Sequence, residues 1–314
     1  MKNLATVVIP CFNVEGFIAE CLESVLLQGE VVAETYVVDN NCTDRTMDVV
    51  AEWCKKHPEF NLTIRKEKKK GAPAARNNPL ANVQTKWVQF LDADDLLEPQ
   101  KIKGQLLKFP NADIVCGGAL HRSILGVERL QTPNPNIALG LIEGRMGNTC
   151  SNLFRTTMLR RVQGWDESLT SSQEYDLMFR VWAHDGLFKT EEEIRSTIRA
   201  RASGQISQTN ATERWINVVS LRMKMLGVLE QKGVPSEDMR LALQAVFDKV
   251  RILFRYDHSA AAEIYDELKK KRFRPRLTPS CSLAYVLASR FLGVVNTEKI
   301  IDLLVAIRFK NVSA

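Results

Sequence analysis

The sequence predicts an α/β protein with a mostly parallel sheet flanked by helices, followed by an all-helical C-terminal extension. Over roughly the first two hundred residues, short β-branched runs alternate with amphipathic helical patterns, which is the arrangement of strands joined by crossover helices. From about residue 212 onward, only helical periodicity remains. We therefore expect two domains, residues 1–211 and residues 212–314.

The expected elements of the first domain follow one another in a regular order. Leu4–Ile9, bounded by Pro10, has the β-branched composition of a buried strand. Further strands are expected at residues 35–38, 62–64, 87–91 and 113–117, and at the start of 152–162. Helices are expected at residues 14–28, 43–56 with Thr43 as N-cap, 74–84 shortened by Pro79, 100–108, the end of 152–162, and 173–183. Residues 121–147 are rich in Gly, Pro and Asn and match neither pattern, and a loop of this length is often functional.

Three carboxylates, Asp92, Asp94 and Asp95, directly follow the apolar run 87–91. Ligands of α/β proteins bind at the carboxyl ends of parallel strands, and Asp39 ends another expected strand there. Crowded carboxylates need a cation or strong donors, and Mg²⁺ or Mn²⁺ prefers oxygen ligands. A solvated acidic turn or a helix cap would contain the same residues, so this pattern alone leaves both interpretations open.

Composition and charge exclude several classes of protein. The net charge of +6 is too weak to indicate nucleic-acid binding, although it suits an anionic partner such as a nucleotide or an acidic membrane surface. The seven cysteines are scattered and show no metal-type spacing, which predicts reduced thiols in a cytoplasmic protein. The chain begins with a run too short for a signal peptide, and it contains no uninterrupted apolar run of membrane-spanning length.

Four sequence blocks occur in a fixed order. They are Val8–Glu15, Val37–Asp44, Gly71–Asn77 running on to Phe90–Asp95, and Gly164–Glu167 followed by Gln173–Asp176. Together they resemble family-2 glycosyltransferases of the GT-A fold, the bacterial type that builds surface polysaccharides and glycolipids. The resemblance implies a Rossmann-like sheet and an inverting transferase that uses a nucleotide-sugar donor.

The resemblance assigns donor-binding roles to the first two blocks and to the helix after them. Pro10, Phe12, Asn13 and Glu15 would wrap the base, although an ordinary turn capped by Asn13 has the same composition. Asp39 matches the carboxylate that accepts from uracil N3–H, which favours a UDP-sugar over a cytidine donor; a capped loop is the alternative. The position of Arg76 corresponds to an arginine that contacts the nucleotide, and an exposed helix arginine is the alternative.

The resemblance also assigns the metal and its ligands. Asp92-Ala93-Asp94 matches the Asp-X-Asp element, in which Asp92 faces the ribose and the metal shell. Asp94 would bind Mn²⁺ or Mg²⁺ directly, and the ion would bridge the two phosphates of the donor. Asp95 is expected to cap the next helix.

Glu174 occupies the position of the acidic base that takes the proton from the acceptor hydroxyl. An acidic residue at a helix N-terminus is also favourable for structural reasons. Asp176 is the neighbouring candidate, but it points elsewhere on a helix. Trp165 would offer an apolar face to the acceptor sugar, unless it is a core tryptophan.

The chain departs from the family pattern at three places. Asn40-Asn41-Cys42 replaces Asp-Gly-Ser, and Asn77-Asn78-Pro79 replaces Asn-X-Gly. The late segment 199–207 lacks the expected histidine, so no third metal ligand is assigned there. Arg199 or Arg201 is instead a candidate contact of the diphosphate.

The C-terminal extension lies outside the resemblance. Its helices are expected at residues 213–231, 237–254 with Ser236 as N-cap, 260–271, 282–292 and 297–308. The basic run 269–276, followed by Leu283, Val286, Leu287 and Phe291, is typical of an element that contacts a membrane surface. Such a contact would suit a lipid-linked acceptor at the inner membrane face, whereas a helix packed on the first domain would have the same sequence pattern.

Two other functions remain open at this point. A nucleotide- or glycan-binding module without catalysis would retain the fold, but the intact Asp92, Asp94 and Glu174 disfavour it. A sugar nucleotidyltransferase would also combine a nucleotide with a metal. No Gly-rich phosphate loop with a following lysine succeeds the first strand, which disfavours that second alternative.

Overall fold

The computed structural model describes residues 2, 4–201 and 210–312, excepting the side chains of residues 306 and 308–312. The chain divides into two compact units, Met1–Gln205 and Ile206–Ala314, and each is described by itself. The sequence places the domain boundary at 211/212, which is six residues from this division.

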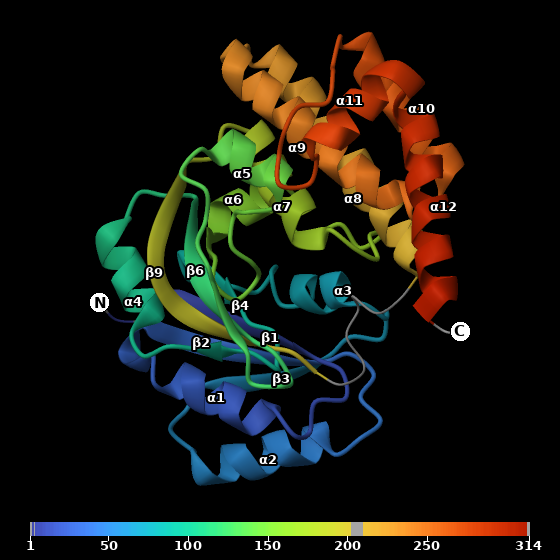
Figure 1. Ribbon diagram of the computed structural model, residues 1–314. Helices are drawn as coiled ribbons and strands as arrows, with labels where there is room; N and C mark the ends of the chain where they lie inside the picture. Colours follow the sequence, from blue (N-terminus) through green and yellow to red (C-terminus); the bar gives the residue numbers. More distant parts are fainter. Residues whose placement is uncertain (1, 3, 202–209, 313–314) are drawn as a thin grey trace. The chain divides into compact units, whose positions relative to one another are not determined.

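The N-terminal unit contains a mixed sheet with the order β3-β2-β1-β4-β8-β6-β9-β5, and β7 pairs with β6 (Figure 1). The four strands β3, β2, β1 and β4 are parallel, as the alternation predicts. Antiparallel pairs join β4 to β8, β8 to β6, β6 to β7 and β9 to β5, so the sheet is less parallel than expected. The strands are β1 Ala5–Cys11, β2 Val32–Asp39, β3 Leu62–Lys66, β4 Trp87–Phe90, β5 Leu96–Leu97, β6 Ile114–Arg122, β7 Glu128–Gln131, β8 Leu153–Arg155 and β9 Phe188–Arg199.

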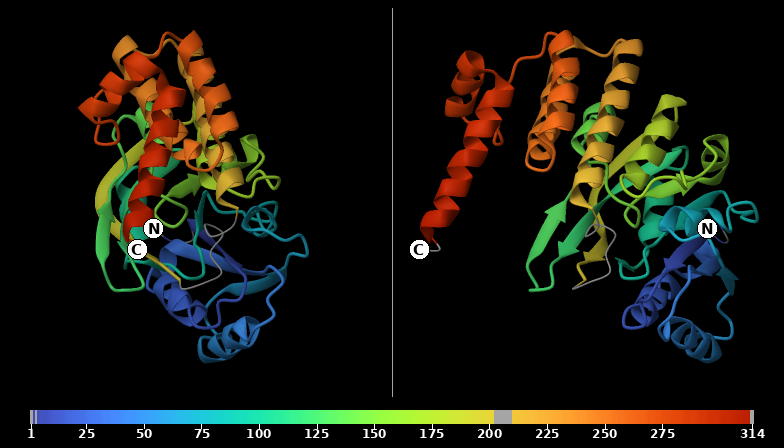
Figure 2. Two further views of the ribbon diagram at one scale, coloured as in Figure 1. Left: turned by 45° about the vertical axis from the view of Figure 1, so that its right-hand side comes forward. Right: turned by 90° about the vertical axis from the view of Figure 1, so that its right-hand side faces the viewer.

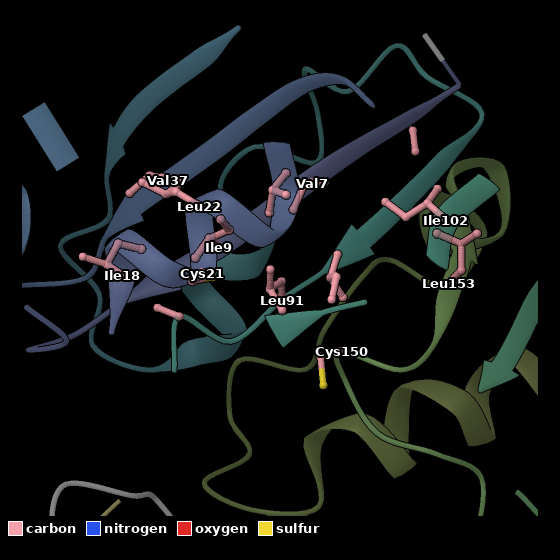
Figure 3. Packing of buried hydrophobic residues seen from close by; sticks show 14 of the residues in the cluster. Val7, Ile9, Ile18, Cys21, Leu22, Val37, Leu91, Ile102, Cys150 and Leu153 are labelled. Carbon is pink, nitrogen blue, oxygen red and sulfur yellow. The ribbon is translucent and has the colours of Figure 1, made fainter. Parts of the chain in front are cut away.

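Helices cover this sheet and bury its apolar side chains. On α1, the inward side chains Ile18, Cys21 and Leu22 pack with strand residues such as Val7 and Ile9 (Figure 3). Their spacing of three and four residues is the helical period that the sequence shows. The helices are α1 Ile18–Leu26, η1 Gly29–Val31, α2 Thr46–Lys56, α3 Ala72–Asn77, α4 Lys101–Lys108, α5 Ile137–Glu143, α6 Thr156–Arg161 and α7 Gln173–Ala183.

Two expected helix caps in the chain are wrong. Helix α2 begins at Thr46, and its N-cap is Arg45 and not Thr43. Asp44, one residue before the cap, accepts a hydrogen bond from the Thr46 backbone N–H at 3.0 Å. Ser236 is the first residue of its helix and not the cap, which is Pro235. The expected cap Asp95 is discussed with the site.

In the part of the chain that the structure describes, the C-terminal unit consists of helices and the loops between them, with one isolated bridge between Thr278 and Cys281. Its core includes the ring of Phe247, which contacts the rings of Tyr265, Phe273 and Tyr285. No helix among the described residues combines the length and the apolar character needed to cross a bilayer. The helices are α8 Ala211–Gln231, α9 Ser236–Phe254, α10 His258–Lys270, α11 Leu283–Leu292 and α12 Val294–Val312.

Candidate active site

The candidate site lies where the parallel strands end, an edge that we call the carboxyl edge. Strand β1 pairs with β2 on one side and with β4 on the other. Asp39 is the last residue of β2, and Asp92 follows the last residue of β4 by two positions. Because parallel strands end at one edge, both acids lie there on either side of β1, which is the arrangement that the sequence predicts.

Arg76 joins the donor-side acid Asp92 to helix α7. Its guanidinium donates to Asp92 Oδ1 at 2.5 Å and to Gln173 Oε1 at 3.3 Å. The Arg76 side chain is only 6% exposed, so it does not present an open face to a nucleotide as expected. Its planar group lies 4.5 Å from the centre of the Trp165 ring, a cation–π contact that fixes its orientation. In this structure, Arg76 therefore orients Asp92 and helix α7.

Asp94 and Asp95 lie against the end of β9. Arg201 Nη1 lies 3.5 Å from Asp94 Oδ2, and Arg199 Nε donates to the Asp94 carbonyl. Asp95 is buried and accepts from the Arg199 backbone N–H at 3.0 Å, so it does not cap α4. Burial and the nearby charge of Asp92 raise the pKa of the Asp94 carboxyl, and burial raises that of Asp95 further.

This crowding of acids is suited to a divalent cation. Among the residues that the structure describes, no three His, Cys, Asp or Glu side chains form a metal-holding group. Burial first, and then the charge of Asp92, raise the pKa of the Asp94 carboxyl. Mg²⁺ typically uses one or two carboxylates and completes its shell with water and substrate phosphates. The pair therefore fits an ion that binds together with a diphosphate.

The two loops expected to bind the base are bound to each other. Asn13, with a positive φ of 50°, accepts from the Thr43 backbone N–H at 2.8 Å. Glu15 accepts from the Arg45 backbone N–H at 2.8 Å. Arg201 donates to the Asn13 carbonyl at 2.8 Å and so connects this loop to Asp94. The side chains of Asn13 and Glu15 therefore shape the loop.

Four other residues that the sequence predicts to bind the donor lie at this edge. Phe12 is 52% exposed, whereas Pro10 is partly buried at the end of β1 and Ala93 is buried. Asp39 accepts from the Cys42 backbone N–H at 2.9 Å, and Lys66 lies 3.9 Å from its other oxygen. A carboxylate has about four acceptor positions, so Asp39 retains capacity for a further donor.

The carboxylate of Glu174, in the first turn of α7, accepts from the Thr149 hydroxyl at 3.0 Å. Asp176 pairs instead with Arg180 at 2.8 Å, one turn further along the helix. Because Asp176 is paired within α7, we assign it a structural role. Glu174 is therefore the better-placed candidate for the acidic base. Thr149 was not predicted, because it lies next to the segment 121–147, where no pattern marks a partner.

Trp165 corrects one expectation, that it faces the acceptor. It is 2% exposed, and its ring packs edge-on against Phe90 with centroids 5.1 Å apart. Asn77 holds its backbone by accepting from the Trp165 N–H at 2.9 Å and donating to its carbonyl at 2.8 Å. Gly164 has a φ of 68°, and a Cβ there would lie 2.5 Å from Asn77 Oδ1, so glycine is required. Trp165 thus supports Arg76 from within the core.

The departures from the family pattern have structural counterparts. Asn40 and Asn41 donate to backbone carbonyls of the segment 66–70, at 2.7 to 3.2 Å. Asn78 donates to Glu67 at 2.9 Å just after α3, which ends earlier than the expected 84. Of the late segment 199–207, residues 202–207 lie outside the described residues, whereas Arg199 and Arg201 both contact Asp94.

Three of the six basic residues in the run 269–276 pair with acids. Lys269, Lys270 and Lys271 lie 2.5 to 2.6 Å from Asp266, Glu267 and Glu230. Of the four apolar residues expected on a membrane surface, Val286 is buried, whereas Leu283, Leu287 and Phe291 are exposed.

Comparison with solved structures identifies the fold. The chain superposes on S. aureus TarS 1–349 in complex with UDP-GlcNAc with a TM-score of 0.61 at 17% identity, covering 96% of this chain and 92% of TarS 1–349. It superposes on the mannosyltransferase PcManGT from Pyrobaculum calidifontis, in complex with GDP-Man and Mn²⁺, with a TM-score of 0.54 at 15% identity, covering 96% and 88%. At these identities, the similarity shows the GT-A fold alone.

Sequence comparison identifies the family. Chondroitin synthase from Escherichia coli is 23% identical over 79% of this chain and 36% of its own length. A putative teichuronic acid biosynthesis glycosyltransferase, TuaG from Bacillus subtilis, is 33% identical over 33% of this chain and 41% of its own length. The chain thus spans about two fifths or less of these relatives. The sequence model of glycosyl transferase family 2 matches residues 6–169, just over half of the chain, so the protein belongs to glycosyl transferase family 2.

Proposed function

We propose that this protein is an inverting, metal-dependent hexosyltransferase that moves a sugar from a UDP-sugar to a hydroxyl of a glycan or lipid-linked acceptor. One observation carries the proposal. Asp92 and Asp94 lie together at the carboxyl edge, and Arg76 connects Asp92 to the helix whose first turn carries Glu174. The contacts of Arg76 therefore connect Asp92, a proposed donor-binding acid, to the helix that carries Glu174, the candidate base.

The nucleotide would bind between the loops that follow β1 and β2. Phe12 offers an exposed aromatic face to the base, next to the loop that includes Pro10, Asn13 and Glu15. Asp39 accepts the uracil N3–H with its remaining acceptor capacity. TarS binds UDP-GlcNAc and PcManGT binds GDP-Man, so the shared fold accommodates both nucleotides. Asp39 is the reason that we propose uridine.

Asp92 and Asp94 would hold the divalent ion, Mn²⁺ or Mg²⁺. When bound, the ion supplies positive charge to the diphosphate and so stabilises UDP as a leaving group. Coordination of Asp94 would also release Arg201 from its 3.5 Å contact with that carboxylate. Arg201 and Arg199 would then be available to bind phosphate oxygens.

Glu174 acts as the base in the transfer step. The acceptor oxygen forms a bond to the anomeric carbon while the bond from that carbon to the phosphate oxygen breaks. The proton of the acceptor hydroxyl passes to Glu174, and UDP leaves from the opposite face, so the configuration inverts. The hydrogen bond from Thr149 at 3.0 Å orients the carboxylate for this transfer.

The biological setting follows from the relatives. Those relatives include a chondroitin synthase and a putative teichuronic acid biosynthesis glycosyltransferase. We propose that this chain likewise contributes to a cell-surface polysaccharide or glycolipid, acting at the inner face of a membrane.

A thermal-shift screen of UDP-, GDP- and CDP-sugars, with and without Mn²⁺, tests the donor assignment. A UDP-sugar should raise the unfolding temperature only, or mainly, when Mn²⁺ is present, since a bound ligand stabilises the folded state. Release of UDP from the same donor by the purified protein would then show turnover. A shift by GDP-sugars alone would contradict the role of Asp39, and binding without any turnover would contradict the enzyme.

A further inference from the structure

Strands β6 and β7 form a hairpin whose tip is apolar and exposed. Ile124 and Leu125, in the turn, are 63% and 90% exposed, and Val127 and Leu130 are 67% and 64% exposed. Both views in Figure 2 show this green hairpin at the margin of the N-terminal unit. Turn positions usually carry Gly, Pro, Asn, Asp or Ser, so these aliphatic side chains are unusual there.

The hairpin tip is a defined structure. The Ser123 N–H donates to the Val127 carbonyl at 2.9 Å, and the Gly126 N–H donates to the Ser123 carbonyl at 3.0 Å. Gly126 has a positive φ of 76°, which glycine adopts without strain. The Ser123 hydroxyl also accepts from the Val127 N–H at 3.0 Å. The turn is therefore closed without the side chains of Ile124 and Leu125, which are exposed to solvent.

The tip extends outward from the carboxyl edge, next to the candidate site. Arg122, the last residue of β6, is paired with Arg199 of β9, and the Ala200 N–H donates to the Arg122 carbonyl at 2.9 Å. Arg199 in turn contacts Asp94 and Asp95. The turn 123–127 therefore starts beside the acids of the site and extends outward from the carboxyl edge.

The same edge carries a group of exposed lysines at its other end. Strand β3 is parallel to β2, so the segment 66–70 that follows it also lies at the carboxyl edge. Its Lys66, Lys68, Lys69 and Lys70 are exposed, whereas its backbone is held by the side chains of Asn40 and Asn41. Lys69 pairs with Glu167 at 2.8 Å, and Lys66 lies 3.9 Å from Asp39. A fixed backbone thus presents cationic side chains on the side of the site opposite the apolar tip.

We propose that the carboxyl edge docks onto an anionic lipid bilayer. Ile124 and Leu125 enter the boundary between head groups and acyl chains, and the lysines of segment 66–70 contact anionic head groups. The combination favours lipid over a protein partner, because a stable protein interface needs a broad complementary area. A narrow aliphatic tip and a separate group of exposed lysine side chains suit a bilayer. Docking would place the candidate site against the lipid surface. The docking proposal does not depend on which sugar is transferred.

Vesicle co-sedimentation of the full chain tests the apolar contact. Vesicles of phosphatidylcholine with phosphatidylglycerol should bind the protein, and vesicles of phosphatidylcholine alone should bind it less. The variant Ile124→Ser/Leu125→Ser should bind about tenfold or more weakly, from the loss of two buried aliphatic side chains. The matched control is Leu27→Ser/Leu107→Ser, which removes two exposed leucines from helix ends next to the starts of β2 and β6, away from the carboxyl edge. Unchanged thermal unfolding of both variants verifies their folds.

The lysines have their own matched control. Lys68→Gln/Lys70→Gln should lower binding to anionic vesicles by about thirtyfold at low salt, because each of the two cations near such a surface contributes about 1 kcal/mol. Lys55→Gln/Lys56→Gln, at the end of α2 away from that edge, should have much less effect. The proposal is wrong if anionic vesicles do not bind the protein, or if each control weakens binding as much as its test variant. It is also wrong if binding survives in both test variants and is lost in Leu287→Ser/Phe291→Ser, since α11 would then make the contact.

Discussion

Two buried groups of charges, one in each unit, differ in how completely they are compensated. In the C-terminal unit, Glu298 accepts from Arg251 Nε at 2.6 Å and from the Tyr285 hydroxyl at 2.7 Å. The Arg251 guanidinium also lies 3.7 Å from the centre of the Tyr285 ring. Arg251, Tyr285 and Glu298 therefore each have a neighbour of complementary charge or polarity within the group.

The acids of the N-terminal unit form a different kind of cluster. Arg76 pairs with Asp92, and Arg201 lies 3.5 Å from Asp94. Even with these cations nearby, burial and then the neighbouring like charges raise the pKa of the Asp94 and Asp95 carboxyls. Structural networks are paired, whereas strongly perturbed acids of one sign gather at functional sites. We therefore expect the Arg251–Glu298–Tyr285 group to stabilise its unit, and we propose that the Asp92–Asp95 cluster binds a ligand that brings positive charge. Substitutions in the C-terminal group should therefore lower stability, whereas substitutions in the Asp92–Asp95 cluster should lower activity.

The largest effect is expected for Asp94→Ala. Loss of the proposed metal ligand should lower metal-dependent turnover of the donor by about a thousandfold, since such an ion contributes several kcal/mol to the transition state. Release of UDP from the donor measures this, with thermal unfolding as a check on the fold. Asp48→Ala removes an exposed acid on α2 and serves as the control. Turnover within a fewfold of the parent protein would exclude Asp94 as the ligand.

Glu174→Gln should separate binding from transfer. The amide keeps the shape and a contact for Thr149 but cannot take a proton, so transfer should fall by about a hundredfold or more. Donor affinity, measured by titration calorimetry with UDP and Mn²⁺, should stay within about twofold, because the role that we propose for Glu174 is toward the acceptor. Equal losses in both quantities would assign Glu174 to donor binding instead.

Glu298→Ala should chiefly affect stability. Removing one partner of a buried pair leaves Arg251 uncompensated, which costs about 3 kcal/mol of unfolding free energy. Chemical denaturation monitors the loss, and Asp266→Ala, which breaks the exposed pair with Lys269, should cost less than about 1 kcal/mol. A similar cost for both variants would mean that the Arg251–Glu298 network is not the stabilising element.

The last prediction concerns Lys101, a buried base in helix α4. Burial lowers its pKa from 10.5 to about 7, so the folded protein disfavours the proton that the unfolded chain binds. Stability should therefore be lowest below about pH 7 and should rise as the pH approaches 10.5. Lys101→Met should raise the unfolding temperature relative to the parent most at pH 6 and least near pH 10. The exposed Lys103→Met is the control, and a shift that is equal at both pH values would contradict the lowered pKa.

Much of the fold could be predicted because the spacing of apolar residues in the sequence indicates which face of each helix or strand is buried. Helix α7 has the bounds that its periodicity predicts, Gln173–Ala183. Strand β9 was missed because its sequence, FKTEEEIRSTIR, is highly charged and has no clear alternation. Pairing with β6 and β5 stabilises this strand, and such pairing is tertiary information.

The candidate site was predictable in position but not in detail. The ends of expected strands placed Asp39 and Asp92 at one edge, which follows from the sheet topology alone. Arg76 pairs with Asp92 and packs on the ring of Trp165. This arrangement depends on side-chain packing between segments about ninety residues apart. No local pattern reports such a contact.

The central claim is that the Asp92–Asp95 cluster is a cation-dependent donor site. The most direct test is titration calorimetry of UDP into the full chain with and without Mn²⁺, for the parent protein and for Asp94→Asn. The parent should bind UDP at least about tenfold more tightly with Mn²⁺, and Asp94→Asn should lose that gain while it retains its fold. An equal gain from Mn²⁺ in both proteins, or none in the parent, would contradict the claim.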